Sequence, residues 1–150
     1  MKTLVVGLGN PILSDDGVGL CVAAKLREII RNPDVTVSES ERSGMDLLEI
    51  FSGYDRVIVV DAILTKNGVP GTIHRFDPSS LKRSRHIETT HGLNFADSLE
   101  TYRKLGLKLP AEIIIVAIES QDVSTFSEDC TLPVSNSIPA CVELIAKMLE

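Results

Sequence analysis

The chain has 150 residues, of which 43% are hydrophobic and 24% charged, with a formal net charge of -6. A chain of this length buries about 70% of its unfolded surface in one core, which predicts a single domain over residues 1–150. The acidic excess repels phosphate backbones and argues against a nucleic-acid binder, so a protein, a peptide or a metal is the expected partner.

The first half of the chain alternates predicted strands and helices. Short apolar, β-branched runs are typical of buried strands, and apolar residues spaced by three or four positions are typical of helices. The predicted elements are a strand at 4–8, a helix at 17–30, a strand at 35–37, a helix at 44–51 and a strand at 56–60 that stops at Asp61.

The second half continues the alternation. A turn signal at 67–71 precedes an alternating strand at 72–76, which we expect at a sheet edge. A helix is predicted from the candidate N-caps Thr89 and Thr90 to Gly106. The most apolar strand follows at 112–118, and a final helix carries Pro139 in its first turn.

This order predicts an α/β fold, a three-layer sandwich with a twisted, mostly parallel sheet of about five strands and helices on both faces. Ligands of such sheets bind at the carboxyl ends of the strands. No apolar run approaches the roughly 20 residues that span a bilayer. The apolar start breaks at Gly7, before a signal sequence is complete, so we expect a cytoplasmic protein without a membrane partner.

The loop at residues 7–19 follows the first strand and carries most of the chemical information. It begins Gly-Leu-Gly-Asn-Pro, but a dinucleotide loop would need glycine where Ile12 stands. Asp15 and Asp16 would also repel a phosphate at the start of the next helix, whereas two carboxylates favour a cation. The simpler alternative is that one of the two acids caps the helix.

The opening of the chain has two family resemblances. Peptidyl-tRNA hydrolase also opens Gly-Leu-Gly-Asn-Pro, but its later Thr-Arg-His-Asn stretch has no counterpart here, and it remains a distant alternative. Gly-x-Gly-Asn, followed by an acidic pair and Gly-x-Gly, resembles the hydrogenase maturation endopeptidases. In that family the second acid of the pair binds metal and is often Glu; here it is Asp16.

Two further residues match the metal-binding set of the family. Asp61 follows an apolar strand, where an Asp can also simply bond a turn, and His91 stands at a predicted helix start. The other histidines fit less well, because His74 is predicted to face solvent and His86 belongs to a basic stretch. The resemblance assigns Asp16, Asp61 and His91 as both the catalytic and the metal-binding residues.

The resemblance implies an endopeptidase that removes a C-terminal peptide from the nickel-loaded precursor of a [NiFe]-hydrogenase large subunit. Nickel would be carried by this substrate, and two carboxylates with one imidazole suit such a borderline metal. A non-catalytic metal-binding or scaffold module of the same fold is the alternative. Whether metal-activated water or a carboxylate base performs the hydrolysis stays open, as does the oligomeric state.

Two other features bear on the chemistry. The chain has no Gly-x-Ser-x-Gly elbow and no HExxH helix, and its three cysteines suggest neither a disulfide framework nor a zinc site. Residues 116–123 resemble the late strand and following loop of the family, although Ser120 replaces the expected proline. The Ser-rich stretch at 121–136 is predicted to be a surface connection or a mobile loop that contacts the precursor.

Overall fold

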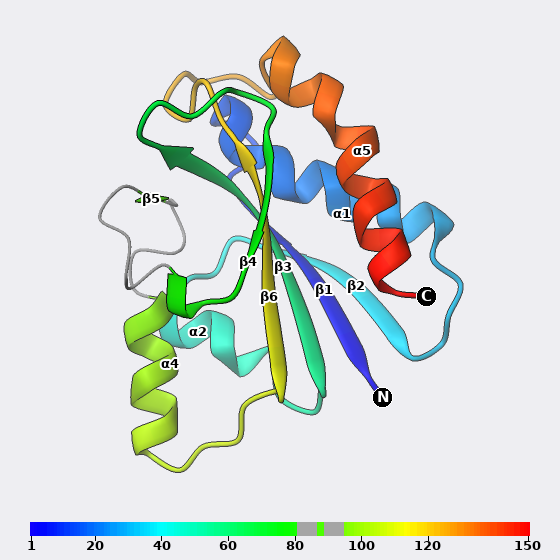
Figure 1. Cartoon of the computed structure of the whole chain (residues 1–150), viewed down its shortest axis with the longest axis vertical. Coiled ribbons are helices and arrows are strands. Elements are labelled where there is room, and N and C mark those ends of the chain that lie inside the picture. The colour runs from blue at the N-terminus through cyan, green and yellow to red at the C-terminus, as the bar shows by residue number, and fades with distance from the viewer. Residues whose placement is uncertain (81–86, 89–94) are drawn as a thin grey trace.

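A computed structural model describes residues 1–80, 87–88 and 95–150 of the chain. Its centre is a six-stranded sheet with the order β2-β1-β3-β6-β4, and β5 pairs with β3 off this path (Figure 1). The strands are β1 Thr3–Leu8, β2 Val35–Ser40, β3 Arg56–Thr65, β4 Ile73–Phe76, β5 Ile87–Glu88 and β6 Glu112–Glu119. The helices are the 3-10 helix η1 Ser14–Gly17, then α1 Val18–Ile29, α2 Gly44–Glu49, α4 Phe95–Lys104 and α5 Leu132–Met148.

The sheet confirms the predicted α/β class. Strands β2, β1, β3 and β6 are parallel, because the chain returns between them through helices, while β4 runs antiparallel to β6. Strand β4 lies at the end of the strand order, as its alternating sequence predicts. The parallel strands therefore bring their carboxyl ends to one rim.

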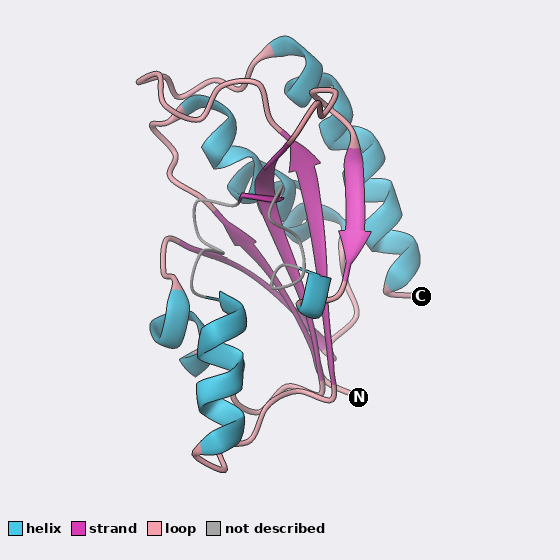
Figure 2. Cartoon of the chain, turned by 60° about the vertical axis from the view of Figure 1, so that its left-hand side comes forward, coloured by secondary structure: helices cyan, strands magenta, loops and turns pink. Residues whose placement is uncertain are grey.

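Helices cover both faces of the sheet and form two separate cores. Helices α1 and α5 pack on one face, where Val22, Ile58 and Ile145 belong to one cluster of buried side chains. Helices α2 and α4 pack on the other face, where the rings of Phe51 and Phe95 meet edge to face with centroids 6.1 Å apart. Figure 2 shows the sheet between the two helical layers, so the predicted three-layer sandwich is confirmed.

Two glycines allow α1 to lie directly on the sheet. A Cβ at Gly19 would overlap the carbonyl oxygens of Leu8 and Val60, and a Cβ at Gly7 would overlap the carbonyl of Gly19. Only glycine fits where two backbones approach this closely. This close contact fixes the start of α1 against the carboxyl ends of β1 and β3.

Strand β3 is longer than the sequence pattern predicts. It does not stop at Asp61 but continues to Thr65, because Ala62 and Ile63 remain paired with β6 and are buried. A single acidic side chain does not end a strand whose backbone partners continue. Asp61 therefore lies inside the strand, one residue beyond the level where β1 pairs with it through Gly7 and Val60.

The last helix begins earlier than predicted. Pro133, not Pro139, occupies the first turn of α5, and Pro139 lies inside the helix, where it cannot donate to the carbonyl of Ser135. The apolar positions Val134 and Ile138 are buried against the sheet, which offsets the missing hydrogen bond. The early part of α5 therefore forms through packing that the local sequence does not reveal.

Helix α4 ends as predicted at Gly106, which has a φ of 71° and donates to the carbonyl of Arg103. Its predicted N-caps, Thr89 and Thr90, lie outside the described residues. Within the described chain, no helix is both long enough and apolar enough to cross a membrane.

Candidate active site

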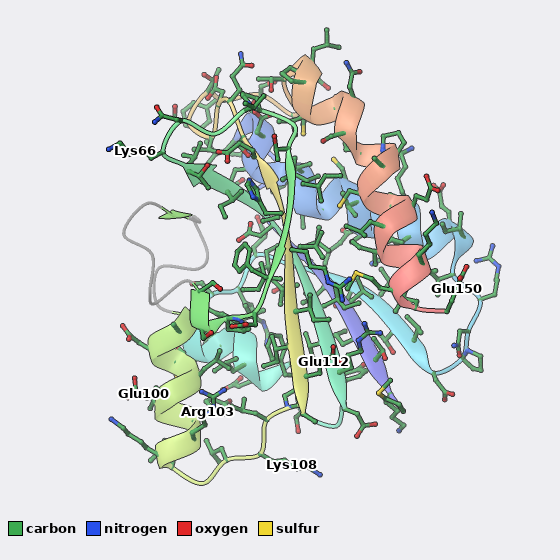
Figure 3. The ribbon with its side chains drawn as sticks, in the orientation of Figure 1. Lys66, Glu100, Arg103, Lys108, Glu112 and Glu150 are labelled. Atoms are coloured by element: carbon green, nitrogen blue, oxygen red, sulfur yellow. The ribbon has the colours of Figure 1, made fainter. Side chains whose placement is uncertain are left out.

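The candidate site lies at the carboxyl ends of the parallel strands. Figure 3 labels Lys66, just beyond β3, and Glu112, at the start of β6, at opposite ends of the sheet. The rim on the Lys66 side receives η1 from β1, and η1 contacts β3 there. All four buried acidic side chains of the described chain lie at this rim, namely Asp15, Asp16, Asp61 and Glu119.

Asp16 is fully buried within η1, at 0% exposure. Its Oδ2 accepts a hydrogen bond of 3.1 Å from the backbone N–H of Asn10. Its Oδ1 has no hydrogen-bond partner among the described residues. A buried carboxylate oxygen without a partner is costly, so this atom is suited to a ligand from outside the described part of the chain.

Asp61 is 3% exposed and points to the α2 and α4 side of the sheet, as Val59 and Ile63 do. Its Oδ1 accepts a hydrogen bond of 2.8 Å from the N–H of Ala62. The expectation that Asp61 ends its strand is wrong, because β3 continues past it to Thr65. Since Leu8 follows the Gly7–Val60 pair, Asp61 lies next to the end of β1, from which the Asp16 loop departs.

The third predicted site residue, His91, lies outside the described residues. Strand β5 precedes it in the chain by three positions and pairs with Leu64 and Thr65 of β3. Among the residues the structure does describe, no group of three or more His, Cys, Asp or Glu side chains could hold a metal ion. The three-residue ligand set is therefore still a prediction, with two of its members placed at one rim.

Asp15 has a different role from its neighbour. Its carboxylate, 0% exposed, accepts hydrogen bonds from the backbone N–H groups of Gln121, Asp122 and Thr131 at 2.7 to 3.0 Å, and from the hydroxyl of Thr131. Neither acid caps α1, whose N-cap is Gly17 without a side-chain bond, so the capping alternative is wrong. Asp15 instead binds the start of α5 and the loop before it through these hydrogen bonds.

The stretch at 121–136 is only partly a loop. Residues from Leu132 onward belong to α5, and residues 121–131 are attached to the opening loop through a parallel bridge between Leu13 and Ser127. Within this segment, hydrogen bonds from Thr125 and then Ser124 lower the pKa of Asp122 to about 2. The candidate site is thus bordered by a loop held in place by backbone bonds and by Asp15.

Glu119 is a buried acid that the sequence reading did not select. It ends β6 at 1% exposure, and its Oε2 accepts a bond of 2.8 Å from the N–H of Thr65. Its Oε1 contacts the hydroxyl of Thr65 and lies 3.2 Å from Nε2 of His74. The expectation that His74 faces solvent holds only in part, because its side chain is 33% exposed and also contacts Glu119. The sequence signal that could have identified Glu119 is its position at the end of the most apolar strand.

The cysteines are unbridged, and two of them lie beside the opening loop. The Cys130 thiol hydrogen-bonds to Cys21 and lowers the pKa of Cys21 to about 7, while the same contact and burial raise the pKa of Cys130. Burial raises the pKa of Cys141 to about 12. These thiols have no described imidazole beside them, so a cysteine-protease arrangement finds no support in the described part of the chain.

A cavity of about 530 Å³ lies away from this rim. It is bordered by α4, the start of β6 and the segment after β4, and contains Glu100 and Arg103, labelled in Figure 3 near the opposite end of the sheet. None of the buried acids lines it. Its size alone does not make it the reaction site, because the buried carboxylates lie at the other end of the sheet.

Comparison with known proteins connects the chain to one family. The family model described as hydrogenase maturation protease matches residues 20–148, a segment that contains Asp61 and His91 but begins after Asp16. The chain is 31% identical over 121 residues to the hydrogenase 2 maturation protease of Escherichia coli strain K12, covering 79% of this chain and 73% of that protein.

Solved structures give the same result. The hydrogenase maturating endopeptidase HybD from E. coli superimposes with a TM-score of 0.84 and 26% identity, over 99% of this chain and 92% of that one. A [NiFe] hydrogenase maturation protease, HybD from Thermococcus kodakarensis, has the same fold with a TM-score of 0.79 over 100% of both chains, at 24% identity. The sequence and structural relationships agree, and the chain belongs to the hydrogenase maturation protease family, whose members are peptidases.

Proposed function

We propose that this protease removes a C-terminal peptide from the nickel-loaded precursor of a [NiFe]-hydrogenase large subunit, and that Asp16, Asp61 and His91 bind the nickel that the precursor brings. One observation carries the proposal: Asp16 Oδ1 is a buried carboxylate oxygen without a partner in the described chain, at the rim that also holds Asp61. Carboxylate oxygens and an imidazole nitrogen are ligands that a borderline divalent ion accepts.

A metal delivered by the substrate suits this rim. Two acids and one imidazole leave coordination positions for ligands of the precursor, so that the ion connects enzyme and substrate. The bound ion would polarise the scissile carbonyl or activate water. We also propose a cytoplasmic location, which the three unbridged cysteines support because thiols stay reduced there.

Mass spectrometry of a coexpressed large-subunit precursor tests the proposal. The wild-type protease should shorten the nickel-loaded precursor by one C-terminal peptide and leave the nickel-free precursor intact. Asp16→Asn, Asp61→Asn and His91→Gln should each abolish this cleavage, whereas Asp122→Asn, which alters a partly exposed acid nearby, should not. Complete processing by any of the three site variants would remove that residue from the ligand set.

Calorimetry separates the proposal from a non-catalytic metal-binding module. The family membership favours an enzyme, and a site completed by the substrate should bind free nickel weakly. Tight nickel binding by the isolated protein, with no cleavage of any precursor, would favour the binding module instead. The two readouts together therefore distinguish a protease from a metal carrier.

A further inference from the structure

Two cysteine side chains from distant parts of the chain meet beside the opening loop. Cys21 lies near the start of α1, and Cys130 immediately precedes Thr131, the N-cap of α5. Their thiols share a hydrogen bond, and both side chains are partly exposed and pack against the same apolar cluster. The third cysteine, Cys141, is buried within α5. Cys21 and Cys130 are therefore placed to react with each other and with a small molecule from solvent.

The backbone around Cys130 is held on both sides of the thiol. The Ser14 hydroxyl donates to the carbonyl of Asp129 at 3.1 Å, and the N–H of Thr131 donates to Asp15 Oδ1 at 2.7 Å. The Sγ atom of Cys130 also lies 3.9 Å from the carbonyl oxygen of Ser14. These bonds attach the segment before α5 to η1, which leads directly into α1. The contact between the two thiols therefore follows from the fold and not from one side-chain rotamer.

The two thiols differ in reactivity. The hydrogen bond from Cys130 lowers the pKa of Cys21 to about 7, although burial opposes this shift, and the same contact raises the pKa of Cys130. Near pH 7 about half of the Cys21 side chains are then thiolates, the form that attacks a disulfide. Burial raises the pKa of Cys141 to about 12, which leaves almost no thiolate there. Cys21 is thus suited to react first.

From this arrangement we infer that Cys21 and Cys130 are a modification site that forms a reversible disulfide, with Cys21 as the attacking thiol and Cys130 as the resolving one. The co-reactant is a low-molecular-weight disulfide, and the reaction requires neither nickel nor the precursor. In the cytoplasmic location proposed above, disulfides are usually transient, catalytic or redox-sensing, so the two thiols stay unbridged until an oxidant reaches them. The bond would join α1 to the segment that Asp15 binds, beside the candidate site.

The reaction takes two exchange steps, written here with glutathione disulfide. The Cys21 thiolate attacks one of its sulfur atoms, so that a mixed disulfide forms and one glutathione leaves and takes up a proton. The Cys130 thiol then loses its proton to solvent and attacks the Cys21 sulfur, which releases the second glutathione. Two protein thiols are oxidised, and one glutathione disulfide is reduced to two glutathione molecules. Because the mixed disulfide removes the Cys21 thiolate, it also removes the main cause of the high pKa of Cys130 before the second step.

Mass spectrometry with peptide mapping tests the inference on the reduced, full-length protein. After incubation with glutathione disulfide at pH 7, the wild-type chain should be lighter by two hydrogen atoms, with a Cys21–Cys130 linkage that dithiothreitol reverses. Cys141 is the internal control and should stay reduced, because it is buried and its pKa is high.

The variants assign the two roles. Cys130→Ala should stop at one glutathione bound to Cys21. This adduct should form about 5- to 8-fold more slowly than the wild-type protein reacts, because the lost thiolate outweighs the gain in nucleophilicity as the pKa of Cys21 returns toward 9.0. Cys21→Ala should react more slowly still, because burial and Asp15 keep the pKa of Cys130 high.

Three wild-type results would overturn the inference: both thiols still reduced, a glutathione adduct that never becomes a linkage, or a linkage that involves Cys141 or a second chain. None of these needs a substitution, so the site can be refuted even if a variant does not fold. Cleavage of the precursor is a separate readout, and its failure would count against the proposed function alone.

Discussion

Substitution of the adjacent acids Asp15 and Asp16 by Asn should affect stability very differently, although both side chains are fully buried. Donors approach both oxygens of Asp15: the Thr131 N–H on Oδ1, and the Gln121 and Asp122 N–H groups on Oδ2. An asparagine has one oxygen and one NH₂ group. Whichever way the amide is turned, its NH₂ faces at least one backbone N–H.

The cost of Asp15→Asn follows from this mismatch. One buried N–H left without an acceptor costs about 1–3 kcal/mol, and the remaining bonds lose the strength that a charged acceptor gives them, about 1 kcal/mol in total. We therefore expect the free energy of unfolding to fall by about 3 kcal/mol. For a chain of this size that corresponds to a decrease in Tm of roughly 6–12 °C.

Asp16→Asn should leave stability nearly unchanged. The side-chain oxygen can keep the 3.1 Å bond from the Asn10 N–H, and the NH₂ group replaces Oδ1, which has no partner in the described chain. An unpartnered neutral group replaces an unpartnered charge, so the free energy of unfolding should change by less than about 1 kcal/mol. Processing of the precursor should nevertheless be lost.

Urea unfolding followed by circular dichroism measures both variants, and mass spectrometry of the precursor measures cleavage. The expected pattern is an unstable Asp15→Asn protein and a stable, inactive Asp16→Asn protein. Equal destabilisation by the two substitutions would show that Asp16 is a structural acid like Asp15. A stable Asp16→Asn protein with full activity would show that its unpartnered oxygen has no function.

Three further predictions concern packing and protonation. Gly19→Ala should lower the free energy of unfolding by about 3 kcal/mol or more in urea, because its Cβ meets two backbone oxygens, whereas Gly53→Ala, in open space but at a φ of 88°, should cost only about 1 kcal/mol. Alkylation of Cys21 should have a midpoint near pH 7, and Cys130→Ala should move it up toward the ordinary pKa of 9.0, as iodoacetamide labelling would show. The carboxyl signal of Asp122 in NMR should titrate near pH 2, and a midpoint near pH 4 would contradict this prediction. Because folding lowers the pKa of Asp122, the stabilisation that its carboxylate provides is complete above about pH 4 and is lost as the pH falls toward 2.

The sequence was sufficient to predict the layers of the fold and the rim of the sheet at which the candidate site lies. Apolar runs and helical periodicity identify strands and helices, and parallel strands necessarily gather their carboxyl ends at one rim. The shared rim of Asp16 and Asp61 follows in this way, because the opening loop and Asp61 each come after an apolar strand, whereas their selection as ligands came from the family resemblance. The exact end of β3 was not predictable, because it depends on pairing with β6 and β5 beyond Asp61.

Contacts between segments far apart in the chain could not be predicted from the sequence. Asp15 bonds residues 106 to 116 positions away, and nothing in the local sequence distinguishes that role from capping. The contact between His74 and Glu119 needs the antiparallel register of β4 on β6, which an alternating strand pattern does not fix. The prediction from the alternating pattern therefore placed His74 in solvent and missed its contact with Glu119.

The hydrogen-bond partners of the buried acids at the rim distinguish acids with a structural role from an acid available for chemistry. Asp15 and Glu119 are surrounded by donors, as buried carboxylates must be if they serve the fold. Asp16 keeps a buried oxygen without a partner in the described chain, next to a strand whose own acid is also buried. A cation brought by the substrate would give this oxygen the partner that it lacks, which is why we expect the site to be completed only when the precursor binds.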